Sequence, residues 1–227
     1  MNMLETAPFF LTVKLALLTT VILFVISIPL GYWLAFSRFR IKFMVEALVS
    51  LPLVLPPTVL GFYLLLAFSP ENALGKFLDN YFDLRLVFTF PGLVVASVIY
   101  SLPFMVQPLK SGFSSIPKAW LDAAYTMGKS RRVTLRKVLL PNMKNSMLTG
   151  AVLTFAHTVG EFGVILMVGG NIPEETRVIS VAIYNEVEAM NYAVANTYSL
   201  ILVGFSFLVL MVTYFVNHRK NSLLTYD

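Results

Sequence analysis

The sequence predicts an all-α integral membrane protein with about five transmembrane helices. Apolar residues make up 57% of the 227-residue chain and charged residues only 13%, whereas soluble domains carry about 25% charged residues. The mean hydropathy is +0.77, and the apolar residues occur in runs long enough to cross a bilayer, which takes about 20 residues. A soluble enzyme, a disordered chain and a fibrous repeat are therefore excluded, because so few polar side chains cannot cover a soluble globule of this size.

Five stretches meet the length requirement of a span. They cover residues 15–36, 47–68, 86–106, 147–168 and 198–216. We expect them to form a single transmembrane domain over residues 1–227. The first stretch is not expected to be a cleaved signal peptide, because its apolar run is too long and Glu5 precedes the first lysine. The absence of cysteine excludes a disulfide framework and a cysteine-based zinc or iron–sulfur site.

The distribution of basic residues orients the predicted helices. Most of the 17 lysines and arginines lie after the first span, in the long connection after the third span, and in the C-terminal tail. They are Arg38, Arg40, Lys42, Lys110, Lys118, Lys129, Arg131, Arg132, Arg136, Lys137, Lys144, Arg219 and Lys220. Because basic connections remain in the cytoplasm, the N-terminus is predicted outside and the C-terminus inside. The formal charge of +5 is then an orientation signal and a contact with membrane lipids, and it does not indicate nucleic acid.

The long cytoplasmic connection over residues 107–146 contains a predicted short amphipathic helix. Ser115 suits its N-cap, Pro117 its first turn and Gly128 its C-terminal end. Residues at helical spacing form its apolar face. They are Ile116, Trp120, Ala123, Ala124 and Met127. A helix this short needs tertiary cover, so it packs on its own bundle, lies in the membrane surface, or docks into a cytoplasmic partner. The adjacent alanines favour close approach of another surface over membrane insertion.

The same connection resembles the EAA loop of ABC-importer permeases. The family pattern is Glu-Ala-Ala, three residues, Gly, nine residues, then Ile-x-Leu-Pro, and every spacing is kept here. Asp122 replaces the Glu and Val138 replaces the Ile. In that family the loop is the coupling helix, which sits in a cleft of the ATPase subunit. The resemblance therefore implies ATPase-coupling roles for Pro117, Trp120, Asp122, Ala123, Ala124, Met127, Gly128 and Pro141.

Other segments resemble the molybdate-transport permeases within this family, and they lie in order across most of the chain. They are residues 51–57, 61–66, 101–106, 159–163 and 171–177. Sulfate permeases, which usually have a longer chain, are the near neighbours. The resemblance implies a type I ABC importer permease fold in a bacterial-type cytoplasmic (inner) membrane. It also implies a homodimer with the pathway on its two-fold axis, two cytoplasmic ATPase subunits that bind ATP-Mg, and an extracytoplasmic oxyanion-binding protein.

Prolines in the second span mark a first candidate part of the translocation path. Pro52, Pro56 and Pro57 lack a backbone donor and disturb the preceding helical turn. In lipid, a freed carbonyl must find a partner or line a wet cavity. The prolines, with Thr58 beside them, therefore form either a simple kink packed against neighbours or a bent helix that lines the path and hinges during gating.

The fourth span supplies the second candidate part of the path. Thr154, His157, Thr158 and Glu161 form a polar stripe at helical spacing. The stripe faces either the dimer axis or pathway, or neighbouring helices with which it exchanges hydrogen bonds. His157 and Glu161 have no third ligand nearby, so no metal site is predicted.

Glu161 is the only acid well inside a predicted span. If the fourth span enters the membrane near Asn145, Glu161 lies about 24 Å along it at 1.5 Å per residue, near its outer end. This carboxylate either pairs with Arg177 of the following loop, and so closes an outer gate or fixes that loop, or is a partly hydrated carboxylate at the interface. Gly160, beside it, permits close backbone approach.

The motifs that the chain lacks restrict its chemistry. It has no Gly-x-x-x-x-Gly-Lys-[Ser/Thr], no His-Glu-x-x-His and no Gly-x-Ser-x-Gly. We therefore expect no catalytic residues and no bound cofactor, with ATP hydrolysed by a separate subunit. The predicted function is the permease subunit of an ATP-driven importer of molybdate or a related oxyanion, with sulfate and tungstate as alternatives.

Two other classes of membrane protein fit the sequence less well than the importer. A stand-alone secondary anion transporter usually shows internal repeats and intramembrane ion sites, and the sequence shows no repeat and one interior acid. A haem-binding anchor subunit would show paired histidines, and the chain has 2 histidines, one of them His218 in the tail. Both classes are therefore less well supported than the importer permease.

Overall fold

The computed structural model describes residues 5–221, with side chains described as far as residue 211. Over the described residues every regular element is helical, which confirms the all-α class. The elements are α1 (Ala7–Phe36), α2 (Lys42–Ser50), η1 (Leu51–Leu53), α3 (Pro57–Phe68), α4 (Ala73–Phe82), α5 (Phe90–Ser114), α6 (Lys118–Thr126), α7 (Arg131–Thr134), η2 (Leu135–Leu139), α8 (Leu140–Asn142), α9 (Lys144–Val159), α10 (Gly163–Gly169), α11 (Ile179–Glu188) and α12 (Tyr192–Asn221).

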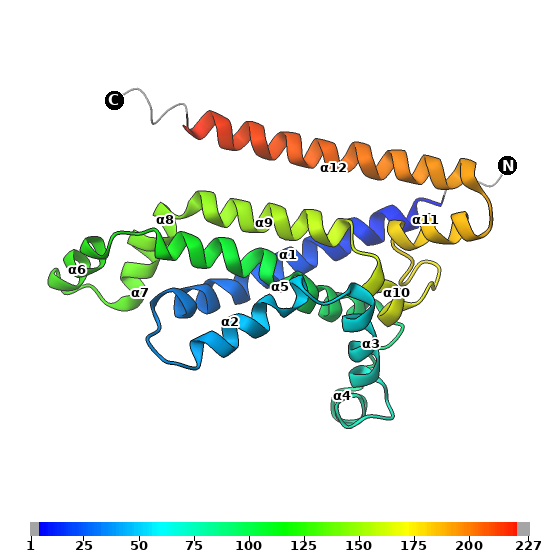
Figure 1. Cartoon of the computed structure of the whole chain (residues 1–227), viewed down its shortest axis with the longest axis horizontal. Coiled ribbons are helices and arrows are strands. Elements are labelled where there is room, and N and C mark those ends of the chain that lie inside the picture. The colour runs from blue at the N-terminus through cyan, green and yellow to red at the C-terminus, as the bar shows by residue number, and fades with distance from the viewer. Residues whose placement is uncertain (1–4, 222–227) are drawn as a thin grey trace.

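Helices α1, α5 and α9 pack against one another as the central bundle (Figure 1). Fully buried Leu23 of α1 lies in one apolar cluster with Met105 and Leu109 of α5. Burial of such side chains stabilises each contact by about 1.5–3 kcal/mol per residue relative to exposure. Gly31 allows α1 to approach α5 closely, because a Cβ at this position would lie 3.3 Å from the Cβ of Leu109. The bundle thus provides the rigid frame of the molecule.

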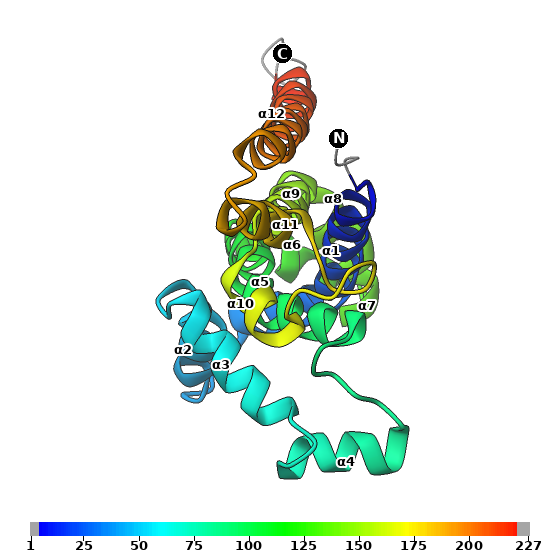
Figure 2. The same cartoon turned by 90° about the vertical axis from the view of Figure 1, so that its right-hand side faces the viewer.

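Over the described residues 5–221, three helices are long and apolar enough to cross a membrane by themselves. They are α1, α5 and residues Tyr192–Met211 of α12, and two bent helix pairs bring the total to five if each pair counts as one span. The bends are 111° between residues Lys42–Leu53 and α3, and 61° between α9 and α10. In Figure 2, α4 and α12 lie on opposite sides of the bundle, so both project away from its centre.

The predicted second span, residues 47–68, is not one straight helix but α2, η1 and α3. Pro52 lies in the short 3₁₀ turn η1, and Pro56 precedes α3 in an extended conformation with φ −55° and ψ 136°. Pro57 then occupies the first turn of α3, where its missing N–H costs nothing. Consecutive prolines cannot continue the helical hydrogen bonding, so the predicted kink is a break that turns the chain through 111°.

The cytoplasmic connection also differs from its predicted boundaries. Helix α5 continues to Ser114, well into the predicted loop over residues 107–146. Ser115 is the C-cap of α5, and its Oγ donates to the carbonyl of Gly112 at 2.9 Å. The prediction that Ser115 caps α6 is therefore wrong, because this hydroxyl is already used by the preceding helix. Pro117, in an extended conformation, occupies the N-cap position instead.

Candidate functional site

Helix α6 lies with α7 at one end of the molecule, opposite the end that holds α11 and the start of α1 (Figure 1). Ala124 of the predicted apolar face is buried, at 6% exposure, and so is Ile116 just before α6, whereas Trp120 is 46% and Met127 71% exposed. A shallow apolar cavity of about 350 Å³ lies between α6 and α7, and Ala123 and Val138 are among the residues that line it. Packing within the chain therefore covers part of the apolar face and leaves Trp120 and Met127 exposed.

Gly128 ends the α6 segment in the left-handed region, at φ 71°. Its N–H donates to the carbonyl of Tyr125 at 2.9 Å, and the N–H of Lys129 donates to Ala124 at 3.0 Å. This is the usual glycine end of a helix. A Cβ at Gly128 would meet nothing within 4 Å. Within this chain, glycine is therefore favoured at position 128 by its positive φ and not by lack of space.

Two further residues of the predicted ATPase contact, Asp122 in the middle of α6 and Pro141 in α8, are both exposed.

The breaks of the second and fourth spans lie against each other. A Cβ on Gly163, at the start of α10, would lie 2.8 Å from the Cβ of Pro57 and 3.4 Å from the backbone nitrogen of Thr58. One turn further along α3, a Cβ on Gly61 would lie 2.8 Å from the Cβ of Met167. Glycines thus let α3 and α10 approach at backbone distance. The two segments predicted to line the translocation path, in the second and fourth spans, are therefore in contact. Pro56, Thr58 and Gly160 at these breaks are exposed.

The polar stripe of α9 lies mostly against α5. The hydroxyls of Thr158 and Ser101 are 3.0 Å apart, and the Ser101 hydroxyl is also 3.0 Å from Nδ1 of His157. The His157 ring stacks on Phe104 with 3.9 Å between centroids. Thr154 is fully buried. Within the chain, His157 and Thr158 thus make the interhelical contacts that are the alternative to a pathway lining, whereas the Thr154 hydroxyl has no hydrogen-bond partner among the described residues.

Glu161 lies in the break between α9 and α10 and is only 4% exposed. Its backbone carbonyl accepts a 2.6 Å hydrogen bond from the hydroxyl of Ser180. Neither carboxylate oxygen has a hydrogen-bond partner among the described residues. The expectation of a partly hydrated interface carboxylate is therefore wrong for this structure, because both carboxylate oxygens are buried within the chain.

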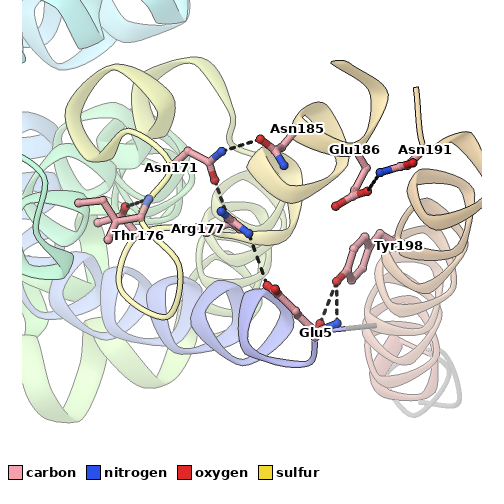
Figure 3. Close-up of polar contacts among 9 residues, drawn as sticks. Glu5, Asn171, Thr176, Arg177, Asn185, Glu186, Asn191 and Tyr198 are labelled. Atoms are coloured by element: carbon pink, nitrogen blue, oxygen red, sulfur yellow. Dashed lines mark hydrogen bonds and ion pairs between the residues drawn. The ribbon is translucent and has the colours of Figure 1, made fainter. Parts of the chain in front are cut away.

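Arg177 pairs with another acid. Its Nη1 lies 3.5 Å from a carboxylate oxygen of Glu5, and its Nε donates to Oδ1 of Asn171 at 2.6 Å (Figure 3). The predicted pair with Glu161 is therefore not formed. Asn171 also donates to Asn185 of α11 at 2.8 Å, and the backbone N–H of Glu5 donates to the hydroxyl of Tyr198 at 2.9 Å. This outer network joins the beginning of α1 to the loop after α10, to α11 and to α12.

Sequence reasoning missed three members of the outer network: Glu5, Asn185 and Tyr198. Each is an ordinary polar residue in a connection or near a helix end, and each partner lies far away in the chain. The one available signal was the resemblance over residues 171–177, which contains both Asn171 and Arg177.

The broken spans, the projecting α6 and the all-helical bundle define a class of membrane transport component. The chain belongs to the family described as binding-protein-dependent transport system inner membrane component, whose model matches residues 27–221. It is 51% identical to the molybdenum transport system permease protein ModB of Azotobacter vinelandii, over 92% of this chain and 93% of that protein. It is 33% identical to a putative molybdenum transport system permease protein of Bacillus subtilis, over 94% and 92%. It is 29% identical to the sulfate permease CysT of Salmonella typhimurium, over 90% and 73%.

Solved structures agree on the fold. A chain of the MetNI methionine ABC transporter matches with a TM-score of 0.73 at 20% identity, covering 94% of both chains. A chain of a bacterial alginate ABC importer matches with a TM-score of 0.77 at 17% identity, covering 98% of this chain and 80% of that one. The chain therefore has the fold of an ABC importer permease. It is the non-catalytic membrane component of such a system, whose other components are an ATPase and a binding protein.

Proposed function

We propose that the chain forms the membrane pathway of a homodimeric ATP-driven importer of molybdate or a related tetrahedral oxyanion. Two ATPase subunits, each with bound ATP-Mg, sit under the two copies of α6, and an oxyanion-binding protein docks on the outer face. ATP binding closes the ATPase dimer, moves α6 and switches the permease between inward-facing and outward-facing states.

The observation that carries the coupling part of this proposal is the exposure of α6 at the cytoplasmic end of the bundle. Trp120 and Met127 are exposed although they are large and apolar, and such side chains form good anchors when a partner covers them. Asp122, Gly128 and Pro141 lie on the same exposed segment. We assign these residues, with Pro117, Ala123 and Ala124, to the contact with the ATPase.

The oxyanion assignment comes from the relatives. The two molybdenum permeases match nearly end to end, and the protein from Azotobacter vinelandii exceeds half identity. The described side chains of residues 5–211 include no buried lysine or arginine. Lys14 of α1 is exposed above the ring of Phe90, and Lys110 of α5 pairs with Glu46. A pathway without buried bases suits a passing dianion that is selected elsewhere, by the binding protein.

The contact between the breaks of α2–α3 and α9–α10 is our candidate for the moving part of the path. Pro56, Pro57, Thr58 and Gly160 lie at these breaks. Irregular backbone at membrane depth requires protein or water around it. The exposed faces of α3 and α12 leave room for a second copy of the chain, which would place these residues near the two-fold axis.

Molybdate uptake in cells tests the proposed substrate. A bacterial strain without its own molybdate permease would receive this chain with its cognate ATPase and binding protein. Molybdenum accumulation from dilute molybdate is expected, with competition by tungstate and weaker competition by sulfate. Accumulation of sulfate that dilute molybdate does not inhibit would assign the chain to sulfate import instead.

A further inference from the structure

A cavity of about 710 Å³ opens between the cytoplasmic end of α1 and α6. It lies on a different face of α6 from the apolar cavity beside α7. The residues of α6 that line it recur at helical spacing. They are Lys118, Leu121, Asp122 and Tyr125. The large exposed side chains assigned to the ATPase contact, Trp120 and Met127, face the other cavity. Of the residues assigned to the ATPase contact, Asp122 alone lines the larger cavity, so most of that contact lies away from it.

Three bases and one acid line this cavity. The bases are Arg38, Lys118 and Arg131, and the acid is Asp122. All four are exposed, and none forms an ion pair with another residue of the described range. Three bases outnumber the one acid, so the lining carries a net positive charge that attracts an anion. Guanidinium groups also match the oxygens of a phosphate. The charge of the cavity thus favours an anionic ligand.

The depth of the cavity places it at the membrane surface. The apolar helix α1 ends at Phe36, and both Tyr32 and Trp33 line the cavity just before that end. Tyrosine and tryptophan near the end of a span lie at the level of the lipid head groups. The Tyr32 ring packs on Phe36 at 5.0 Å and on Phe113 of α5 at 5.6 Å between centroids. This aromatic wall is fixed to the bundle and faces the same space as the bases.

A wall that is aromatic on the membrane side and basic on the cytoplasmic side fits an amphipathic anion. We propose that the cavity binds the phosphate head group of an anionic phospholipid of the cytoplasmic leaflet. Arg38, Lys118 and Arg131 hold the phosphate, and Trp33 and Phe36 contact the start of the hydrocarbon chains. Because the ligand bridges α1 and α6, the lipid steadies α6 against the bundle. This inference concerns lipid binding and does not depend on which oxyanion the protein carries.

The two tryptophans of the chain allow a direct test. Trp33 lines this cavity and Trp120 lines the other, so a Trp120→Phe chain reports from Trp33 alone. The full-length chain is reconstituted in phosphatidylcholine vesicles that contain equal mole fractions of either brominated phosphatidylglycerol or brominated phosphatidylcholine. Bromine quenches a contacting indole. We expect much stronger quenching by the anionic lipid, since each base contributes about fivefold to its local enrichment.

Neighbouring arginines provide a matched control. Arg131 lines the cavity, whereas Arg132 is equally exposed and lines neither cavity of this end. The Arg38→Gln/Arg131→Gln double variant should reduce quenching by the anionic lipid to the phosphatidylcholine level, while Arg132→Gln should keep it. Equal loss in Arg132→Gln would overturn the proposal, because it would mean diffuse attraction to the basic face.

Two further outcomes bear on the site. Inorganic phosphate or molybdate that relieves the quenching at low concentration would show a soluble-oxyanion site and overturn the lipid assignment. Native mass spectrometry of the unchanged chain does not depend on folding of the variants. Retention of phosphatidylglycerol in preference to phosphatidylcholine supports the site, and equal retention of the two lipids contradicts it.

Discussion

Nη1 of Arg177 lies 3.5 Å from the carboxylate of Glu5, so the loop before α11 is held to the residue that leads into α1. The Arg177 side chain is 19% exposed and the Glu5 side chain 57%. The pair is therefore partly screened by solvent, and its strength is that of a surface ion pair. Asn171 orients the guanidinium, because its Oδ1 accepts a 2.6 Å hydrogen bond from Nε of Arg177.

A double-mutant cycle with Glu5→Gln and Arg177→Gln tests this outer pair. We expect a coupling free energy of about 0.2–1 kcal/mol in the free energy of unfolding, measured by SDS titration in mixed micelles. The parallel cycle with Glu161→Gln and Arg177→Gln should be additive within about 0.5 kcal/mol. A coupling free energy in the Glu161–Arg177 cycle and none in the Glu5–Arg177 cycle would show instead that Arg177 pairs with Glu161.

Glu161→Gln by itself should not destabilise the protein. Both carboxyl oxygens are buried without a hydrogen-bond partner among the described residues, and an unpaired buried polar group opposes folding. The apparent melting temperature at neutral pH should stay the same or rise, as followed by loss of monodisperse protein on heating. A large fall would mean that the carboxylate has a partner in the assembled transporter.

Gly163→Ala should weaken the contact between α3 and α10. The new methyl group would lie 2.8 Å from the Cβ of Pro57, and such overpacking costs about 1–3 kcal/mol. Gly204→Ala in α12 is the matched control, because a Cβ there meets nothing within 4 Å, and helix propensity predicts a gain of up to about 1 kcal/mol. Equal stability of the two variants, measured by SDS titration, would argue against a close α3–α10 contact.

Substitutions of Gly128 separate backbone conformation from partner contact. Its positive φ costs a residue with a side chain about 1–2 kcal/mol, less for asparagine than for alanine. If only the backbone matters, Gly128→Asn should couple ATP hydrolysis to uptake better than Gly128→Ala. The Gly128→Asp protein should insert normally into the membrane, but ATP hydrolysis should no longer drive uptake, since the substitution places a charge on the surface assigned to the ATPase. Uptake per ATP hydrolysed is the measurement, and wild-type coupling in Gly128→Asp would remove this loop from the ATPase contact.

The sequence predicted the helical class, the approximate apolar segments and the amphipathic segment of α6, because each depends on local composition and periodicity. It also indicated disturbances at Pro52, Pro56 and Pro57. It could not predict a 111° turn, because a kinked helix and a broken helix have the same prolines, and the contact of Pro57 with Gly163 decides between them.

The partners of single side chains were beyond sequence reasoning. Local reasoning offers Glu161 as a partner of Arg177, because Glu161 is the one acid well inside a predicted span. In the structure Glu161 is buried in the break after Val159, and α1 brings Glu5 to Arg177 from the other end of the sequence. Similarly, the Ser101–His157 contact depends on the register of α5 against α9, which no local pattern contains.

ATP-dependent oxyanion uptake by the purified assembly tests the central claim most directly. This chain, its ATPase and its binding protein would be reconstituted in proteoliposomes, with molybdenum counted inside after addition of molybdate. The account predicts uptake only when ATP-Mg is present on the ATPase side, and loss of that uptake in Gly128→Asp. Uptake that proceeds without ATP, or that follows an ion gradient, would contradict it.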